Sequence, residues 1–214
     1  MMIIAVDGPA ASGKGTLSKR VAVHYALAYL DTGSLYRAVA RDTVIAGGDP
    51  RDENAAVTAA EKIDPTTLED PGLRARGVGE AASIVAAHAK VRAALLAYQR
   101  SFATQPAGAV IDGRDIGTVI CPDATVKLFV TASPEERAHR RYLQLVDGGV
   151  TVTEDEVLAD IRKRDERDKG REAAPLIKAD DAHLLDTTNL SIDAAFKAAI
   201  DLIDAALGRT GSAS

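Results

Sequence analysis

A glycine-rich segment near the N-terminus constrains this chain more than any other part of its sequence. A short apolar run at residues 3–6 is typical of a strand, ends at Asp7, and is followed after the segment by a helical pattern with Leu17 and Val21. Between them stand Gly8, Pro9, Ala10, Ala11, Ser12, Gly13, Lys14, Gly15 and Thr16. Glycines let successive backbone N–H groups turn inward around a polyphosphate, and the helix N-terminus adds partial positive charge. Strand, loop and helix in this order therefore predict a phosphate-binding loop.

The side chains with expected chemical roles in this loop are Lys14 and Thr16. We expect Lys14 to bridge the β- and γ-phosphates of ATP, and the Thr16 hydroxyl to bind Mg²⁺. The alternative, a glycine-rich turn with an incidental lysine, is disfavoured because strand, loop and helix occur in the expected order. Gly15 separates the lysine from the hydroxyl, and this G-K-G-T form resembles nucleoside monophosphate kinases more than GTPases. A GTPase would also carry D-x-x-G and N-K-x-D strings, and neither occurs in this sequence.

Composition excludes several classes of protein. The 214 residues carry a formal net charge of −5, whereas a binder of nucleic acids or anionic membranes needs a positive surface. No run approaches the ~20 apolar residues of a membrane span. The single cysteine, Cys121, rules out an internal disulfide, and the first residues lack the pattern of a signal peptide. We therefore expect a cytoplasmic monomer that binds small molecules and has neither nucleic acid nor membrane as a partner.

The alternation of strand-like and helical stretches predicts the fold class. Strand-like apolar runs occur at residues 3–6, 27–30, 110–111, 126–130 and 184–185. Helical stretches separate them, which predicts an α/β fold, a doubly wound parallel sheet of about five strands. Capping-box patterns predict helix starts at Ser133, three residues before Glu136, and at Thr153, three residues before Glu156.

These elements fit a single P-loop domain over residues 1–214. We expect its core at residues 1–37, 107–143 and 160–208, an acceptor-binding insert at 38–106, a small lid at 144–159 and a frayed tail at 209–214. The insert has helical character at residues 81–102. No strands are evident in the link at residues 64–79, which contains both proline and glycine.

Five further segments, taken in order, resemble a known family. They are D-T-G-S-L-Y-R at residues 31–37, A-A-S-I-V-A-A at 81–87, V-R-A-A-L-L at 91–96, D-G-R-D-I-G-T at 112–118 and R-D-E-R-D-K-G-R at 164–171. Together with the phosphate-binding loop, they resemble bacterial cytidylate kinases over nearly the whole chain. The resemblance implies transfer of the γ-phosphate of ATP to CMP or dCMP with Mg²⁺. Many members carry a longer insert with a small sheet, so the short link at residues 64–79 departs from the family pattern.

The resemblance also implies roles for single residues. The acceptor phosphate would be held by Arg37, Arg114 and Arg171, and the last two are also catalytic candidates. The cytosine readers would be Ser83, Arg92 and Asp115, with Arg164 and Asp168 near the ribose and Thr32 as a further substrate-binding residue. These roles are chemically sensible, because an acceptor phosphate must be neutralised before a second phosphoryl group approaches it. A cytosine edge likewise needs both a donor and an acceptor opposite it.

Two groups of these residues have simpler interpretations. Arg164, Asp168 and Arg171 are spaced like solvated ion pairs on one helix face, and without the resemblance that interpretation would be preferred. Asp112, at the end of the third strand, either orients Mg²⁺ through water or caps the following loop, and the residues leave both open.

The base readers have simple alternatives as well. Asp115 could cap a loop, and Ser83 could bond its own helix backbone. Arg92, nine residues beyond Ser83 in the same expected helix, could be a surface charge.

Three arginines follow the fourth predicted strand on the helix that leads to the lid. Arg137, Arg140 and Arg141 are each able to act as an internal arginine finger on the transferred phosphoryl group. We take Arg141 as the candidate, although the sequence does not separate the three. A kinase for another acceptor, such as UMP, AMP or shikimate, is the enzymatic alternative. A nucleotide-gated interaction module is the non-enzymatic one.

Overall fold

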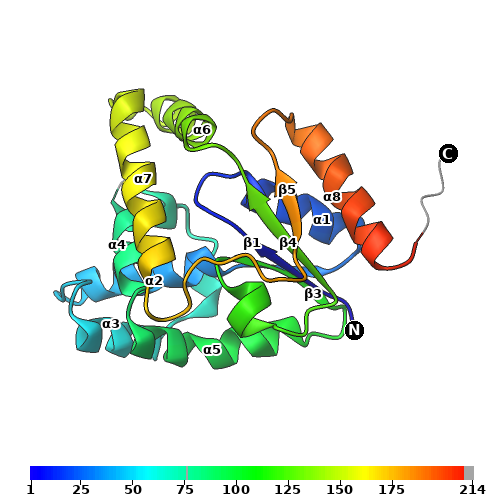
Figure 1. Cartoon of the computed structure of the whole chain (residues 1–214). Helices are drawn as coiled ribbons and strands as arrows, with labels where there is room; N and C mark the ends of the chain where they lie inside the picture. Colours follow the sequence, from blue (N-terminus) through cyan, green and yellow to red (C-terminus); the bar gives the residue numbers. More distant parts are fainter. Residues whose placement is uncertain (76, 210–214) are drawn as a thin grey trace.

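Five parallel strands form one sheet at the centre of the molecule (Figure 1). In the computed structural model, which describes residues 1–75 and 77–209, the strand order is β2-β3-β1-β4-β5. The strands are β1 (Ile3–Asp7), β2 (Ala28–Asp31), β3 (Ala109–Gly113), β4 (Val126–Thr131) and β5 (His183–Asp186). All neighbouring strands are parallel, which confirms the predicted fold class. Residues 210–214 of the predicted tail lie outside the described residues.

Helices cover both faces of this sheet (Figure 1). They are α1 (Lys14–His24), α2 (Thr32–Ile45), α3 (Glu53–Ala60), α4 (Val78–Val85), α5 (Ala89–Ala103), α6 (Pro134–Asp147), α7 (Glu154–Gly170) and α8 (Ile192–Ala206). Short helical turns are η1 (Pro65–Thr67), η2 (Pro71–Arg74) and η3 (Ile116–Ile120), the last of π type. No helix in residues 1–75 or 77–209 combines the length and hydropathy that a membrane span requires.

Side-chain alternation along β1 divides the core between the two faces. Ile4 and Val6 pack with α1 and α8, whereas Ala5 packs with Leu35 of α2 and Leu95 of α5. Because all strands run in the same direction, the loops that follow β1, β2 and β3 meet at one edge of the sheet. The glycine-rich loop and the two Asp-containing segments are therefore brought together.

The helix starts predicted at Ser133 and Thr153 are confirmed. The Ser133 hydroxyl accepts a hydrogen bond from the backbone N–H of Glu136 at 3.2 Å and begins α6. Thr153 begins α7 with a complete capping box, since the Glu156 carboxylate also accepts the Thr153 N–H at 2.8 Å. Helices α6 and α7 pack against each other at the side of the sheet (Figure 1).

The single helical stretch expected at residues 81–102 is wrong in one respect, because two helices occupy this part of the chain. Helix α4 begins earlier, at Val78, and the backbone turns extended at His88, with φ −76° and ψ 119°. The His88 ring lies 2.9 Å from the carbonyl of Pro50, a contact between residues far apart in sequence. Ser83 and Arg92 consequently lie on α4 and α5, not on one helix.

The link at residues 64–79 contains η1 and η2 and no strand among its described residues, as expected. Arg41 of α2 holds it, donating to the Asp70 carboxylate at 2.8 Å and to the Thr67 hydroxyl at 3.2 Å. The division into core, insert and lid stays a prediction.

Candidate active site

The glycine-rich loop starts against the backbone of β4. Gly8 has φ +151°, and a Cβ atom there would lie 1.9 Å from the Val130 carbonyl oxygen, so no other residue fits. Gly13, with φ +83°, precedes Lys14, the first residue of α1. The loop therefore delivers Lys14 at the helix N-terminus, where backbone N–H groups are free to meet an anion.

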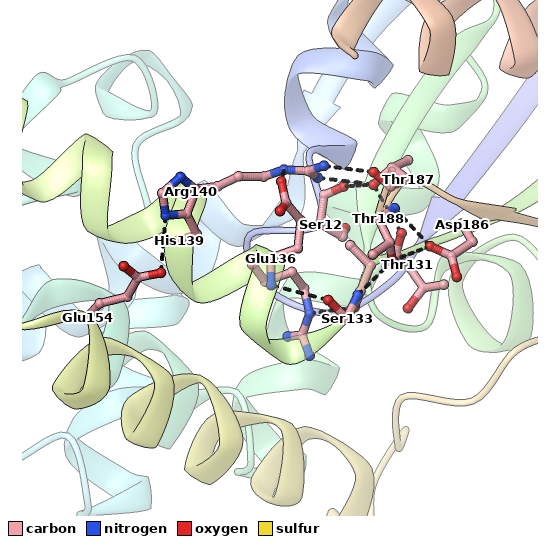
Figure 2. Close-up of polar contacts among 12 residues, drawn as sticks. Ser12, Thr131, Ser133, Glu136, His139, Arg140, Glu154, Asp186, Thr187 and Thr188 are labelled. Carbon is pink, nitrogen blue, oxygen red and sulfur yellow. Dashed lines mark hydrogen bonds and ion pairs between the residues drawn. The ribbon is translucent and has the colours of Figure 1, made fainter. Parts of the chain in front are cut away.

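Thr187, the residue directly after β5, contacts this loop, and Arg140 of α6 contacts Thr187 in turn (Figure 2). The Thr187 hydroxyl lies 3.0 Å from the carbonyl oxygen of Ser12 and 3.1 Å from that of Thr131. Arg140 donates to the Thr187 carbonyl at 2.7 Å and to the Glu136 carboxylate at 2.8 Å. Sequence reasoning missed Thr187, because only the fold brings the end of β5 beside the loop.

Two carboxylates stand at neighbouring strand ends beside Lys14. Asp31 and Asp112 are register partners in β2 and β3, and the Lys14 ammonium lies 3.1 Å from the Asp112 carboxylate. Burial lowers the pKa of Lys14 and raises that of Asp112, and outweighs their mutual attraction. The Thr32 hydroxyl donates to the Asp112 carbonyl at 2.8 Å, so this predicted substrate-binding residue also braces the strand end.

The oxygen atoms around Lys14 fit Mg²⁺. The hydroxyl of Thr16 and the carboxylate of Asp112 are hard oxygen donors. One Asp112 oxygen lies 3.1 Å from the Lys14 ammonium, and the other accepts only a long hydrogen bond of 3.4 Å from the Tyr29 hydroxyl. Within residues 1–75 and 77–209, no group of three or more acidic, histidine or cysteine side chains could cage a metal. This suits Mg²⁺, which usually binds through one or two carboxylates together with substrate phosphates and water.

Several arginines converge on the acceptor side of the loop. Arg114 donates from Nε to the Asp168 carboxylate at 2.9 Å, and Arg164 lies 3.9 Å from the same oxygen. Arg37 donates to the Asp31 carboxylate at 2.7 Å. Asp168 is only 3% exposed, so it does not form the solvated ion pair considered as an alternative. The placement of all three residues on one helix face is wrong for Arg171, because α7 ends at Gly170 and the backbone of Arg171 is extended, with φ −62° and ψ 136°.

These arginines retain donors that no described residue satisfies. They are Nε of Arg37, Nε of Arg164, and both Nε and Nη2 of Arg171. Burial and Arg114 lower the pKa of Arg164 to about 10, and burial also lowers that of Arg171. A buried excess of positive charge with unsatisfied guanidinium N–H groups matches an anionic phosphate.

Two of the three predicted base readers, Arg92 and Asp115, meet beside this cluster. The Arg92 guanidinium contacts the Asp115 carboxylate, and both side chains are buried. Asp115 precedes η3 but makes no side-chain capping bond, which argues against the loop-cap interpretation. Ser83 is buried with its hydroxyl unpaired among the described residues, so it does not bond its own helix backbone. Arg92 is 8% exposed and is therefore not a surface charge.

The three arginines of α6 differ in how firmly they are held. Arg137 makes two hydrogen bonds to the Asp165 carboxylate, at 3.0 and 2.6 Å, and Arg140 is engaged with Thr187. Arg141 has a long contact of 3.4 Å with Gln144. Burial and then the charge of Arg37 lower the pKa of Arg141. Arg141 is the least firmly held of the three among the described residues, and its role at the phosphates stays a prediction.

A phosphate-binding loop at the carboxyl edge of a doubly wound parallel sheet, facing a buried arginine cluster, defines a P-loop kinase of the nucleoside monophosphate kinase class. A family model described as cytidylate kinase matches residues 4–205. The cytidylate kinase of Rhodopseudomonas palustris strain CGA009 is 59% identical over 204 residues, which are 95% of this chain and 96% of that protein. The cytidylate kinase of Nitrobacter winogradskyi is 58% identical over 212 residues, which are 99% of this chain and 100% of that protein. The chain belongs to the cytidylate kinase family.

Among solved structures, an uncharacterized protein from Eubacterium ventriosum has the same fold. Its TM-score is 0.58 at 16% sequence identity, over 95% of this chain and 99% of that one. At this identity the likeness concerns the fold alone.

Proposed function

We propose that this chain transfers the γ-phosphate of ATP to CMP or dCMP, giving ADP and CDP or dCDP. The observation that carries the proposal is the group of buried, unsatisfied guanidinium donors on Arg37, Arg164 and Arg171 beside the Lys14 loop. A phosphate monoester satisfies such donors. The adjoining Arg92–Asp115 pair supplies the donor and acceptor that a cytosine edge requires.

Positioning and charge neutralisation account for catalysis in this proposal. The acceptor phosphate is already an anionic nucleophile, so the chain has little covalent chemistry to perform. Arg37, Arg114 and Arg171 neutralise and orient that phosphate for in-line attack. Lys14 and Arg141 stabilise charge on the transferred phosphoryl group. Mg²⁺, held by Thr16 and Asp112, would neutralise the ATP phosphates when bound.

Asp168 has two roles in this proposal. Its carboxylate holds Arg114 through the 2.9 Å hydrogen bond from Nε, and it accepts from the ribose 2′-hydroxyl, with Arg164 nearby. We also propose that the chain acts as a cytoplasmic monomer, consistent with its single cysteine and acidic net charge of −5.

The test is ADP release with ATP and each of CMP, dCMP, UMP, AMP and GMP. UMP presents a carbonyl where CMP presents an amino group, so Asp115 would face another acceptor. An unmatched buried polar group costs about 1–3 kcal/mol, so kcat/KM for CMP should exceed that for UMP by roughly ten-fold or more. The Asp115→Ala variant should lose most of this preference. Equal use of CMP and UMP by the wild type would refute the base assignment.

A further inference from the structure

The last residue of β1 makes an unusual pair of hydrogen bonds. Asp7 is 5% exposed, and its carboxylate points at the start of the η3 turn. One oxygen accepts the backbone N–H of Ile116 at 2.8 Å, and the other accepts that of Gly117, also at 2.8 Å. Asp7 thus caps a turn that lies more than 100 residues further along the chain.

This arrangement leaves the carboxylate of Asp115 available. Asp115 stands at the N-cap position of η3, where an aspartate normally accepts N–H groups of its own helix. It makes no such bond. Asp7 occupies the N–H of Gly117, one of the two groups that an N-cap side chain usually accepts, and the Asp115 backbone, with φ −144° and ψ 25°, does not have the extended conformation typical of an N-cap. The Asp115 carboxylate contacts the Arg92 guanidinium instead. The two carboxylates therefore divide two tasks that one aspartate could not perform at once.

The turn and its distant cap fit closely. A Cβ atom on Gly117 would lie 3.4 Å from the Asp7 carboxylate and 3.0 Å from the stem of Lys127. Burial raises the pKa of Asp7 to about 7, while its two hydrogen bonds lower it, and Asp115 and Asp112 raise it further. The turn N–H groups therefore offset part of the cost of an ionised carboxylate at this buried position.

The phosphate-binding loop does not depend on this carboxylate for its starting geometry. The loop begins at Gly8, which is fixed by its close approach to the Val130 backbone. Losing the Asp7 carboxylate should therefore disturb the acceptor side more than the ATP side.

We propose that Asp7 is a positioning residue for recognition of the acceptor base. By capping η3 it frees Asp115 and holds it against Arg92, in the geometry that distinguishes cytosine from uracil. Without the cap, Asp115 turns back to its own backbone and leaves Arg92. The inference rests on the proposed base-reading role of Asp115.

The decisive variant is Asp7→Asn, which keeps the side-chain size and one acceptor but turns an amide donor toward a backbone N–H. We expect its CMP-to-UMP ratio of kcat/KM to fall by roughly ten-fold, with KM for ATP within about two-fold of the wild type. A merely structural role would lower both activities and leave the ratio unchanged, and that result would overturn the proposal. If Asp7→Asn does not fold, Asp7→Glu keeps the charge on a longer side chain, which displaces the carboxylate from the two N–H groups and should lower the same ratio. An unchanged ratio in folded Asp7→Glu would then count against the proposal.

A double variant distinguishes the failure of this inference from the failure of the base-reading role proposed for Asp115. If Asp7 acts through Asp115, then Asp7→Asn should not lower the ratio further in an Asp115→Ala background. Independent, additive losses would contradict the inference. If Asp115→Ala alone leaves the ratio intact, the base-reading assignment fails and the inference fails with it. If Asp115→Ala lowers the ratio but folded Asp7→Asn does not, only the role of Asp7 is wrong.

Discussion

At the scale of single residues, the site is organised by charges that lack partners. Arg171 is 8% exposed, yet two of its guanidinium nitrogens make no hydrogen bond within the described residues. Burying such donors without partners costs free energy, so a fold that retains them is built for a ligand that satisfies them. Lys14 is held differently, at 3.1 Å from the Asp112 carboxylate. An incoming polyphosphate would compete with Asp112 for the same ammonium group.

The first prediction concerns Lys14. Lys14→Met should fold normally and lower kcat by roughly 10²-fold or more, as the loss of one preorganised charge on the transferred group typically does. Lys197→Met, at an exposed lysine of α8 that pairs with Asp201 at the surface, is the control and should retain activity. Steady-state kinetics on both variants is the measurement, and near-normal turnover of Lys14→Met would remove the lysine from the mechanism.

The second prediction concerns the sugar. If Asp168 accepts from the ribose 2′-hydroxyl, then Asp168→Ala removes a contact that CMP makes and dCMP cannot make. A hydrogen bond to a charged group is worth about 1.5–3 kcal/mol, so the CMP-to-dCMP ratio of kcat/KM should fall by roughly ten-fold or more. Both substrates should also slow, because Arg114 loses its partner at 2.9 Å.

The control for this experiment is Asp160→Ala, an exposed carboxylate on the same helix, which should change neither substrate. An unchanged CMP-to-dCMP ratio in Asp168→Ala would mean that Asp168 only positions Arg114 and does not touch the sugar.

At the scale of elements, the phosphate-binding loop contacts the segment directly after β5, which follows the loop by more than 150 residues. The Thr187 hydroxyl lies 3.0 Å from the Ser12 carbonyl, and Arg140 of α6 donates to the Thr187 carbonyl (Figure 2). The loop is therefore braced by two elements that contribute nothing to its sequence motif.

Thr187→Val tests this brace, because it keeps the side-chain shape and removes the hydroxyl. A buried hydrogen bond contributes about 1 kcal/mol, and leaving its partner unsatisfied costs about 1–3 kcal/mol. We expect a loss of unfolding free energy in that range and a raised KM for ATP, with KM for CMP little changed. Thr187→Ser retains the hydroxyl and should restore KM for ATP. If Val and Ser variants bind ATP equally well, the hydroxyl does not support the loop.

The elements differ in how far their sequence predicts them. Strand positions and the fold class followed from apolar runs and their alternation with helices, because burial in a parallel sheet demands such runs. The starts at Ser133 and Thr153 followed from local capping chemistry. The break between α4 and α5 at His88 did not follow from the sequence, because the contact of His88 with Pro50 is a tertiary one. No local signal in an alanine-rich stretch marks it.

The residues and contacts of the site also differ in how far the sequence predicts them. The motifs predicted which residues gather at the strand ends, since each follows a strand in the sequence. They could not predict the contacts made by Asp7 and Thr187, because each joins segments separated by more than 100 residues. The motif at residues 31–37 contains both Asp31 and Arg37, but their hydrogen bond depends on the folded structure and did not follow from the sequence.

At the scale of the whole molecule, α7 connects the parts that the sequence divides into lid, core and insert. Asp168 binds Arg114 beside the sheet, and Arg167 donates to Glu80 of α4 at 2.7 Å. Ionisation of Asp168 should therefore bear on the stability of the entire fold. Burial would raise the pKa of this carboxyl, but Arg114 and the neighbouring arginines outweigh burial and hold it below its usual value.

The sign of the resulting pH dependence follows from that direction. A carboxyl whose pKa is lower in the folded than in the unfolded state stabilises the fold above the unfolded pKa, about 3.9. This contribution is lost as the pH falls through the folded value. Asp168→Asn should therefore cost most at neutral pH, about 3–5 kcal/mol for a broken buried pair, and progressively less below about pH 4.

Denaturant unfolding of wild type and Asp168→Asn between pH 3 and pH 7 measures this difference. Asp193→Asn, at an exposed ion pair with 88% side-chain exposure, is the control and should change stability little at any pH. A gap between wild type and Asp168→Asn that stays constant over the whole range would contradict the assigned pKa direction.

If the arginine cluster receives a cytidine monophosphate, the γ-phosphate of ATP is transferred to that nucleotide, and label transfer measures this step. The enzyme is incubated with ATP labelled in the γ-phosphate, together with CMP, and the products are separated. We predict that the label appears in the β-phosphate of CDP in step with ADP formation, with little free phosphate, and that replacing CMP by UMP lowers kcat/KM roughly ten-fold or more. Label found mainly in inorganic phosphate, or transferred equally well to UMP, would contradict the account.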